Sequence, residues 1–291
     1  MADAVECSLS GYPEREMVES STQVQITSKD ALNRQFKWYK ASLEGVKEPT
    51  RTLLERYSKI PDDQMVKHVM GVAPYPCIGS FRFLEITIYN SAAYPEILAR
   101  LKSGDKYLDL ACALGQDIRH LIFKGAIPSN LYGSDLRPEF FNLGYDLFFD
   151  RSTLKATFIA SDIFDDTSAL LRQLAGKLDI INAASFFHLF DWDSQVSVAK
   201  QVVKLLRPVS GSLLVGRHSG NVRPGKRDGS ELRGPIYRHD TVSFRRLWEQ
   251  VGRETGTEWE ADITEEKWED LQTHADSDEG AFKMQYVIRR V

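Results

Sequence analysis

The sequence has few cysteines and no metal-binding motif. Its 291 residues include three cysteines, Cys7, Cys77 and Cys112, and six histidines. An odd number of cysteines without a CxxC pair supports neither a disulfide framework nor a four-cysteine zinc site, and the histidines show no HxH or HExxH spacing. We therefore expect no metal, and we expect the protein in a reducing compartment, the cytoplasm.

The sequence also lacks a long apolar run and a strong charge of either sign. Residues 1–20 carry acids where a signal peptide needs a basic start, and about 18 consecutive apolar residues occur nowhere. The 37 basic and 41 acidic side chains leave a net charge of −4, which argues against electrostatic wrapping of nucleic acid. We therefore expect neither a nucleic-acid partner nor membrane insertion. Since 42% of the residues are hydrophobic, we expect a folded protein.

The first third of the chain has the pattern of an arm followed by helices. Residues 1–29 are polar and lack periodicity, which predicts a flexible N-terminal arm. Residues 30–103 carry apolar residues at helical spacing and almost no strand pattern, which predicts a helical cap that covers the substrate. The helices of this cap are expected at 30–45, 49–60, 81–89 and 94–101.

Residues 104–291 alternate short apolar runs with helical segments. The strands are expected at 107–110, 130–134, 156–160, 178–183 and 211–216, and the helices between them at 118–123, 139–149, 168–174 and 194–206. This alternation predicts an α/β fold with a parallel, doubly wound, Rossmann-like sheet. Beyond it we expect a basic, Gly-rich loop over 217–238, a helix over 241–251, and exposed strands at 259–263 and 284–291.

The turn after the first strand is rich in small and acidic residues. Ligands of an open parallel sheet bind at the carboxyl ends of its strands, and residues 109–117 at this end read DLACALGQD. Ala111 and Gly115 would let the backbone approach a ligand closely, while Asp109 and Asp117 would place carboxylates beside it. Asp109 has a plainer interpretation as a cap of the following helix.

The next two strands also end in acids. Asp135 would accept both hydroxyls of a ribose, and Leu136 follows it. Asp162 offers an acceptor for an exocyclic amine, and Ile163 offers an apolar face for a purine. The alternative interpretation of Asp162 is a turn residue. A dinucleotide would need a glycine-rich, acid-poor turn for its pyrophosphate. The cationic sulfonium and ammonium groups of S-adenosylmethionine favour acids, so we expect this cofactor and not NAD.

Several segments together resemble a known family. They are YPCIG at 75–79, LDLACALGQDIR at 108–119, GSDLRP at 133–138 and Ser161-Asp162. The sequence is similar to class I S-adenosylmethionine-dependent methyltransferases, and more narrowly to fungal secondary-metabolite enzymes that include meroterpenoid carboxyl O-methyltransferases. The resemblance implies that 104–291 is the cofactor-binding core. It also implies Asp109 at the methionine end, Asp135 at the ribose, and Asp162 with Ile163 at the adenine.

The segment after the fourth strand is expected beside the transferred methyl group. Phe187 would contact the cofactor, Phe190 would suit an apolar substrate, and His188 would act as a general base, as a hydrogen-bond donor to a carboxylate, or only to fix its loop. Arg217 and Arg223 in the basic loop suggest a lid that recruits an anionic acceptor.

In the cap, Tyr75, Arg82 and Phe83 are positioned to reach the site. The expected substrate is a small apolar acceptor such as a meroterpenoid or polyketide intermediate.

The expected reaction is methyl transfer to a carboxylate, with a hydroxyl as the second choice of acceptor. A carboxylic acid is already ionised at neutral pH and needs no base, whereas a phenol must lose a proton. The alternative is a cyclase or isomerase with a methyltransferase fold that transfers no methyl group. Two features keep this alternative open: Ala111 stands where such turns usually have glycine, and the interval between His68 and Tyr75 is short. A homodimer is compatible with the sequence.

Overall fold

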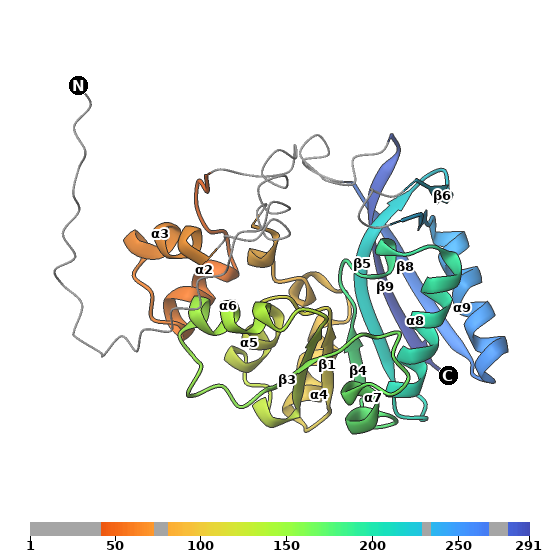
Figure 1. The fold of residues 1–291 in the computed structure, drawn as a ribbon, viewed down its shortest axis with the longest axis horizontal. Coiled ribbons are helices and arrows are strands. Elements are labelled where there is room, and N and C mark those ends of the chain that lie inside the picture. The colour runs from red at the N-terminus through yellow and green to blue at the C-terminus, as the bar shows by residue number, and fades with distance from the viewer. Residues whose placement is uncertain (1–41, 73–80, 229–233, 268–278) are drawn as a thin grey trace.

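A seven-stranded sheet with the strand order β3-β2-β1-β4-β5-β9-β8 forms the centre of the molecule (Figure 1). The computed structural model describes residues 42–72, 81–228, 234–267 and 279–291; the expected arm over 1–29 and most of the helix over 30–45 lie outside them. Strands β1 to β5 pair in parallel, and β9 is antiparallel to β5 and β8. The strands are β1 (Tyr107–Leu110), β2 (Leu131–Asp135), β3 (Thr157–Ala160), β4 (Ile180–Asn182), β5 (Leu213–Asn221), β8 (Trp259–Glu266) and β9 (Ala281–Arg290). The strand order reverses between β1 and β4, which confirms the doubly wound, Rossmann-like fold.

Helices cover both faces of the sheet (Figure 1). One face carries α4 (Tyr94–Lys102), α5 (Gln116–Phe123) and α6 (Glu139–Phe148), and the other carries α7 (Ala169–Leu174), α8 (Trp192–Leu205) and α9 (Thr241–Thr255). Strand residues alternate between the two cores: Ile180 and Leu213 pack with the first set, and Ile181 and Leu214 with the second. None of the helices in this described part is long and apolar enough to cross a bilayer.

The segment before the sheet is helical, as expected. It contains α2 (Thr50–Thr52), the π-helix η1 (Leu53–Tyr57), α3 (Asp62–Val72) and the 3-10 turns η3 (Arg82–Leu84) and η4 (Ile88–Asn90). Helix α3 was not anticipated, and the helix expected at 81–89 is two short turns. Buried residues of this segment share one core with α5 and α6. Helix α4, grouped with the cap in the sequence analysis, packs on the sheet.

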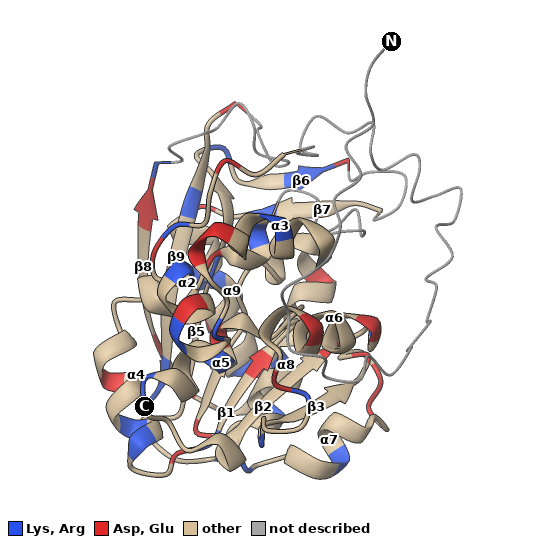
Figure 2. Ribbon diagram, turned by 90° about the vertical axis from the view of Figure 1, so that its left-hand side faces the viewer, with Lys and Arg blue, Asp and Glu red and all other residues tan. Residues whose placement is uncertain are grey.

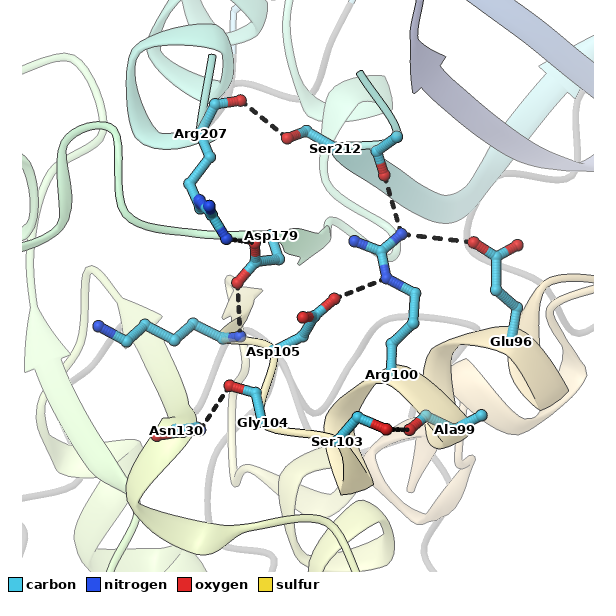
Figure 3. Close-up of polar contacts among 12 residues, drawn as sticks. Glu96, Ala99, Arg100, Ser103, Gly104, Asp105, Asn130, Asp179, Arg207 and Ser212 are labelled. Carbon is cyan, nitrogen blue, oxygen red and sulfur yellow. Dashed lines mark hydrogen bonds and ion pairs between the residues drawn. The ribbon is translucent and has the colours of Figure 1, made fainter. Parts of the chain in front are cut away.

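The amino ends of three strands are joined by a polar network (Figure 3). Arg100 on α4 donates to Asp105 at 2.6 Å and to the Gly211 carbonyl at 2.8 Å. Asp179 accepts from the Lys106 amide at 2.9 Å and from Arg207 at 2.7 Å. These residues immediately precede β1, β4 and β5 or sit beside them. The network therefore fixes the sheet edge opposite the carboxyl ends of the parallel strands.

The structure differs from the sequence prediction after residue 216. Strand β5 continues to Asn221 and pairs with β9 along its whole length. The expected loop over 217–238 therefore begins with a buried strand and continues as a hairpin of β6 (Gly225–Arg227) and β7 (Ile236–Arg238), whose basic residues on β6 are blue in Figure 2. Strand β9, predicted to be exposed, is internal to the sheet. Buried polar residues such as His218 and Ser219 disguised the strand pattern.

Candidate active site

A buried carboxylate lies at the carboxyl end of β1. Asp109 is 3% exposed, and Asn182 on the adjacent strand β4 donates to its Oδ1 at 2.9 Å. Among the described residues, its Oδ2 has no hydrogen-bond partner. Burial and the neighbouring Asp117 raise the pKa of Asp109 well above its usual range. A cationic ligand group would therefore be stabilised here by an otherwise uncompensated carboxylate.

The turn between β1 and α5 holds three residues in the left-handed conformation. Ala111, Ala113 and Gly115 have φ of 60°, 46° and 69°. A Cβ on Gly115 would lie 2.7 Å from the ring of Phe158, so only glycine fits at this position. Each alanine pays about 1–2 kcal/mol for its conformation. Because Ala111 adopts the conformation in which glycine is preferred, the alanine preserves the turn.

Asp135 ends β2 beside this turn. Its Oδ2 accepts from the Ala113 amide at 3.0 Å and its Oδ1 from the Arg137 amide at 3.1 Å. Burial raises the pKa of Asp135, although backbone hydrogen bonds partly oppose the shift. Leu136, the next residue, is 67% exposed. The backbone thus fixes the carboxylate, while each oxygen keeps a lone pair with which to accept from a hydroxyl group.

The end of β3 presents a turn and an apolar ring. Asp162 is exposed and accepts from the Phe164 amide at 2.9 Å, whereas Ile163 is buried. Phe164 is 42% exposed, and its ring packs edge-on against Phe190 at 5.3 Å. The hydrogen bond from the Phe164 amide fits the alternative interpretation of Asp162 as a turn residue. Phe164 is an apolar surface residue that the sequence analysis missed.

Asp117, expected to lie beside a ligand, is bonded to the cap instead. It is 2% exposed, and its two oxygens accept from the Thr87 hydroxyl at 2.7 Å and the Ile88 amide at 2.9 Å. Burial, partly opposed by these bonds and by Arg217, raises the pKa of Asp117 to about 6. Asp117 thus fastens η4 of the cap to α5, and it contributes negative charge to the site without offering a vacant oxygen.

The two candidate residues after β4, Phe187 and His188, have different surroundings. Phe187 has no exposed surface and packs against Phe244 and Tyr286. It is therefore a core residue and not the cofactor contact that we expected. His188, in the 3-10 turn η6 (Phe187–Leu189), accepts from the Ser219 amide at Nδ1 at 3.3 Å. A neutral imidazole that accepts at Nδ1 carries its proton at Nε2. His188 is therefore arranged to donate a hydrogen bond from Nε2.

Arg217 belongs to the sheet and not to a lid. It lies within β5, is 4% exposed, and makes a two-point ion pair with Glu85 next to η3. Burial acts to raise the pKa of Glu85, but the hydrogen bond and charge of Arg217 outweigh it and lower that pKa. The guanidinium thus has a carboxylate partner within the protein, which overturns its expected role as a lid residue. The pair links the cap to β5.

The remaining substrate candidates lie in different surroundings. Arg223 is exposed and pairs with Glu279 at 2.9 Å. Phe83 is 4% exposed and packs near Phe81. Phe190 is half-buried and also packs against Phe186 at 5.2 Å. Tyr75 lies outside the described residues.

Sequence reasoning missed Asn182 and Glu85. Asn182 is the polar last residue of a buried strand, the same signal that identified Asp109 and Asp135, and applying that rule to β4 would have found it. Glu85 carries no such signal because its partner Arg217 lies 132 residues away in sequence.

Comparison with known proteins assigns the family. A family model for the meroterpenoid methyltransferase N-terminal domain matches residues 38–84. The methyltransferase adrK of Penicillium rubens is 46% identical over 87% of this chain and 92% of its own. The O-methyltransferase phiE of a fungal species is 44% identical over 81% of each chain. The Asnovolin E/Chermesin D methyltransferase nvfJ of Aspergillus novofumigatus is 40% identical over 94% of this chain and 99% of its own.

Solved structures also match. One is the Burkholderia thailandensis 1,6-didemethyltoxoflavin-N1-methyltransferase with bound 1,6-didemethyltoxoflavin and S-adenosylhomocysteine, 14% identical with a TM-score of 0.46 over 70% of this chain and 80% of that chain. The assignment rests on the sequence relatives, which are 46% and 44% identical over most of both chains. The protein belongs to the fungal meroterpenoid methyltransferases, which are enzymes that use S-adenosylmethionine.

Proposed function

We propose that this enzyme methylates a carboxylate of an apolar meroterpenoid and so forms a methyl ester. The observation that carries the choice of acceptor is the hydrogen bond from the Ser219 amide to Nδ1 of His188. With Nδ1 occupied as an acceptor, the neutral imidazole carries its proton at Nε2, and a protonated nitrogen suits a carboxylate that is already ionised better than a hydroxyl that must be deprotonated. The name of phiE supports O-methylation, and that of nvfJ supports a small-molecule acceptor.

The chain's own residues fit the cofactor. When bound, S-adenosylmethionine supplies a methyl group activated on a sulfonium. The open Oδ2 of Asp109 would balance the cationic methionine end, and the backbone-fixed carboxylate of Asp135 would accept from the ribose hydroxyls. Ala111 and Gly115 shape the turn between them. On the adenine side we propose three residues that follow β2 and β3: Leu136, Asp162 and Ile163.

Positioning would supply most of the catalysis. A carboxylate oxygen attacks the methyl carbon in line with its bond to sulfur, and that bond breaks as the new one forms, so no proton moves. Holding the reactants in this alignment is worth about 7–11 kcal/mol. His188 would orient the carboxylate from Nε2, and Phe190 would contact the apolar body of the acceptor. Phe83 and Tyr75 remain proposed cap contacts, and Arg223 would attract the anionic acceptor from the surface.

The decisive experiment separates an ester from an ether. The enzyme is incubated with methyl-labelled cofactor and two matched meroterpenoids, one with a free carboxylic acid and one with only hydroxyl groups, and the products are analysed by mass spectrometry. We expect label in the acid alone, released as methanol by mild alkali. Alkali-stable label in the hydroxyl compound would overturn the choice of acceptor. Bound cofactor with rearranged but unlabelled product would favour the cyclase alternative.

The setting of the reaction is part of the proposal. The low cysteine content and the balanced charge support a cytoplasmic enzyme with a small-molecule partner and no nucleic-acid partner. Light scattering of the purified protein would decide whether it forms a homodimer.

A further inference from the structure

We propose that the cap residue Tyr57 tunes cofactor affinity, because Asp150 and Arg119 carry its position to the turn at 111–115. The inference rests on the proposed function, since that turn is assigned there to the cofactor. Tyr57, Asp150 and Arg119 are positioning residues: none would touch the cofactor, and together they would set the shape of the backbone that does.

The guanidinium of Arg119 joins the turn to the end of α6. It is 1% exposed, and its Nη1 donates to the carbonyls of Leu114 at 2.6 Å and Gly115 at 3.3 Å. Its Nε and Nη2 donate to the two oxygens of Asp150 at 2.6 and 2.9 Å. A planar fork bound at both sides cannot rotate without breaking a bond. The position of the turn therefore follows that of Asp150.

The turn has no room to move independently of this pair. A Cβ on Gly144 of α6 would lie 2.3 Å from the Leu114 carbonyl oxygen, and a Cβ on Gly115 would lie 2.9 Å from Nη1 of Arg119. The ring of Phe148 lies 4.6 Å from the guanidinium carbon and closes one side. Because the surrounding groups are in contact, a displacement of Arg119 displaces the two carbonyls with it.

The cap reaches the same carboxylate. The hydroxyl of Tyr57, the last residue of η1, donates at 2.8 Å to Oδ2 of Asp150, the oxygen that also accepts from Nε of Arg119. Burial and the charge of Asp150 raise the pKa of Tyr57 above its usual value, so it remains a donor at neutral pH. A continuous path of short hydrogen bonds thus runs from η1 to the cofactor turn.

A purely stabilising role explains this arrangement less well. A buried ion pair contributes little net stability compared with apolar residues of the same size, whereas it can specify one conformation. Here the conformation specified is a turn with left-handed residues at Ala111, Ala113 and Gly115. Such strain persists only where the surroundings enforce it.

The test compares two tyrosine-to-phenylalanine variants. Tyr57→Phe removes only the hydroxyl that reaches Asp150. Tyr94→Phe is the matched control, because the Tyr94 hydroxyl also contacts α5, at Nε2 of His120 at 2.9 Å, yet no bond of that pair reaches the turn. Three quantities are measured for each: the Kd of S-adenosylhomocysteine by calorimetry, amide hydrogen exchange of residues 111–116 without ligand, and the midpoint of thermal unfolding.

We expect Tyr57→Phe to raise the Kd about 3- to 10-fold and to speed exchange in the turn. This is less than the full effect of losing one hydrogen bond to a charged group, which is above about 10-fold, because Tyr57 does not touch the cofactor. Tyr94→Phe should change neither. A lower unfolding midpoint for Tyr57→Phe with unchanged Kd and exchange would overturn the inference. A different result would show that the turn is not the cofactor site: S-adenosylhomocysteine would then not protect residues 111–116 of the wild-type protein from exchange.

Discussion

Asn182 on β4 donates a hydrogen bond of 2.9 Å to Asp109, its register partner on β1. One oxygen of the carboxylate is thereby fixed, and the other has no partner among the described residues. Burial, Asp117 and Asp135 disfavour the charged form of Asp109 and raise its pKa well above the usual range. A cationic ligand group would offset this cost and favour the carboxylate.

Asp109→Asn should therefore weaken cofactor binding and stabilise the protein. We expect a loss of about 10- to 100-fold in affinity for S-adenosylmethionine, the effect of a lost interaction with a charged group. Because burial raises the pKa of Asp109, its charge is costly at pH 7, and the amide removes that cost while still accepting from Asn182. Calorimetry and urea denaturation measure the two effects. Asp146→Asn, at an exposed site on α6, should change neither, and a loss of stability in Asp109→Asn would indicate a structural carboxylate.

The pKa of Asp117 predicts a pH-dependent stability. Its folded value of about 6 lies above the unfolded value of about 3.9, so the folded state holds this proton more tightly. The carboxyl therefore favours folding most at low pH, and its contribution is lost as pH rises from about 4 to about 6. In Asp117→Asn, Oδ1 can still accept from the Ile88 amide, and Nδ2 can donate to the Thr87 hydroxyl instead of an oxygen accepting from it. We therefore expect the wild type to lose stability relative to the variant between about pH 4 and pH 6. Urea denaturation measures this as a rising difference in the free energy of unfolding, variant minus wild type. A constant difference would contradict the raised pKa of Asp117.

The sequence was informative where the signal is local. Short apolar runs predicted β1 and β2, and the rule for strand ends placed the candidates Asp109 and Asp135 at the carboxyl ends of these strands, because both depend only on neighbouring residues. The roles of Asp117 and Arg217 were wrong because their partners come from the cap, 30 and 132 residues away. For Phe187 the sequence could not distinguish a ligand contact from a core position, because an aromatic residue after a strand suits both.

The polar network at the amino edge of the sheet should affect stability and leave binding unchanged (Figure 3). Asp179→Ala removes the acceptor of the Lys106 amide and of Arg207. The unpaired groups should cost about 1–3 kcal/mol in the free energy of unfolding. The Kd of S-adenosylhomocysteine should not change, because the site lies at the opposite edge. Asp146→Ala is the control, since its ion pair with Arg151 is exposed and worth little. A weaker Kd in Asp179→Ala would show that the two edges are coupled.

Arg223→Gln tests the attraction of an anionic acceptor. Arg223 pairs with Glu279 on the surface, so the fold should be unaffected. The KM for a carboxylate acceptor should rise about 2- to 5-fold at low ionic strength, and the difference from wild type should vanish near 0.5 M salt, because exposed charges are then screened. Arg151→Gln, which breaks the exposed pair with Asp146, should leave the KM unchanged. Equal KM values for Arg223→Gln and wild type at low salt would exclude the role.

Two helical glycines provide a sharp test of how tightly the cofactor turn is packed. A Cβ on Gly144 of α6 would stand 2.3 Å from the Leu114 carbonyl oxygen, whereas nothing lies within 4 Å of one on Gly71 of α3. Gly144→Ala must displace the turn backbone, so we expect a loss of about 1–3 kcal/mol in stability together with a weaker Kd for S-adenosylhomocysteine. Gly71→Ala should gain about 0.5–1 kcal/mol, because alanine is the better helix former, with no change in Kd. If both variants bind as tightly as wild type, the turn tolerates movement, and the packing of α6 does not set its geometry.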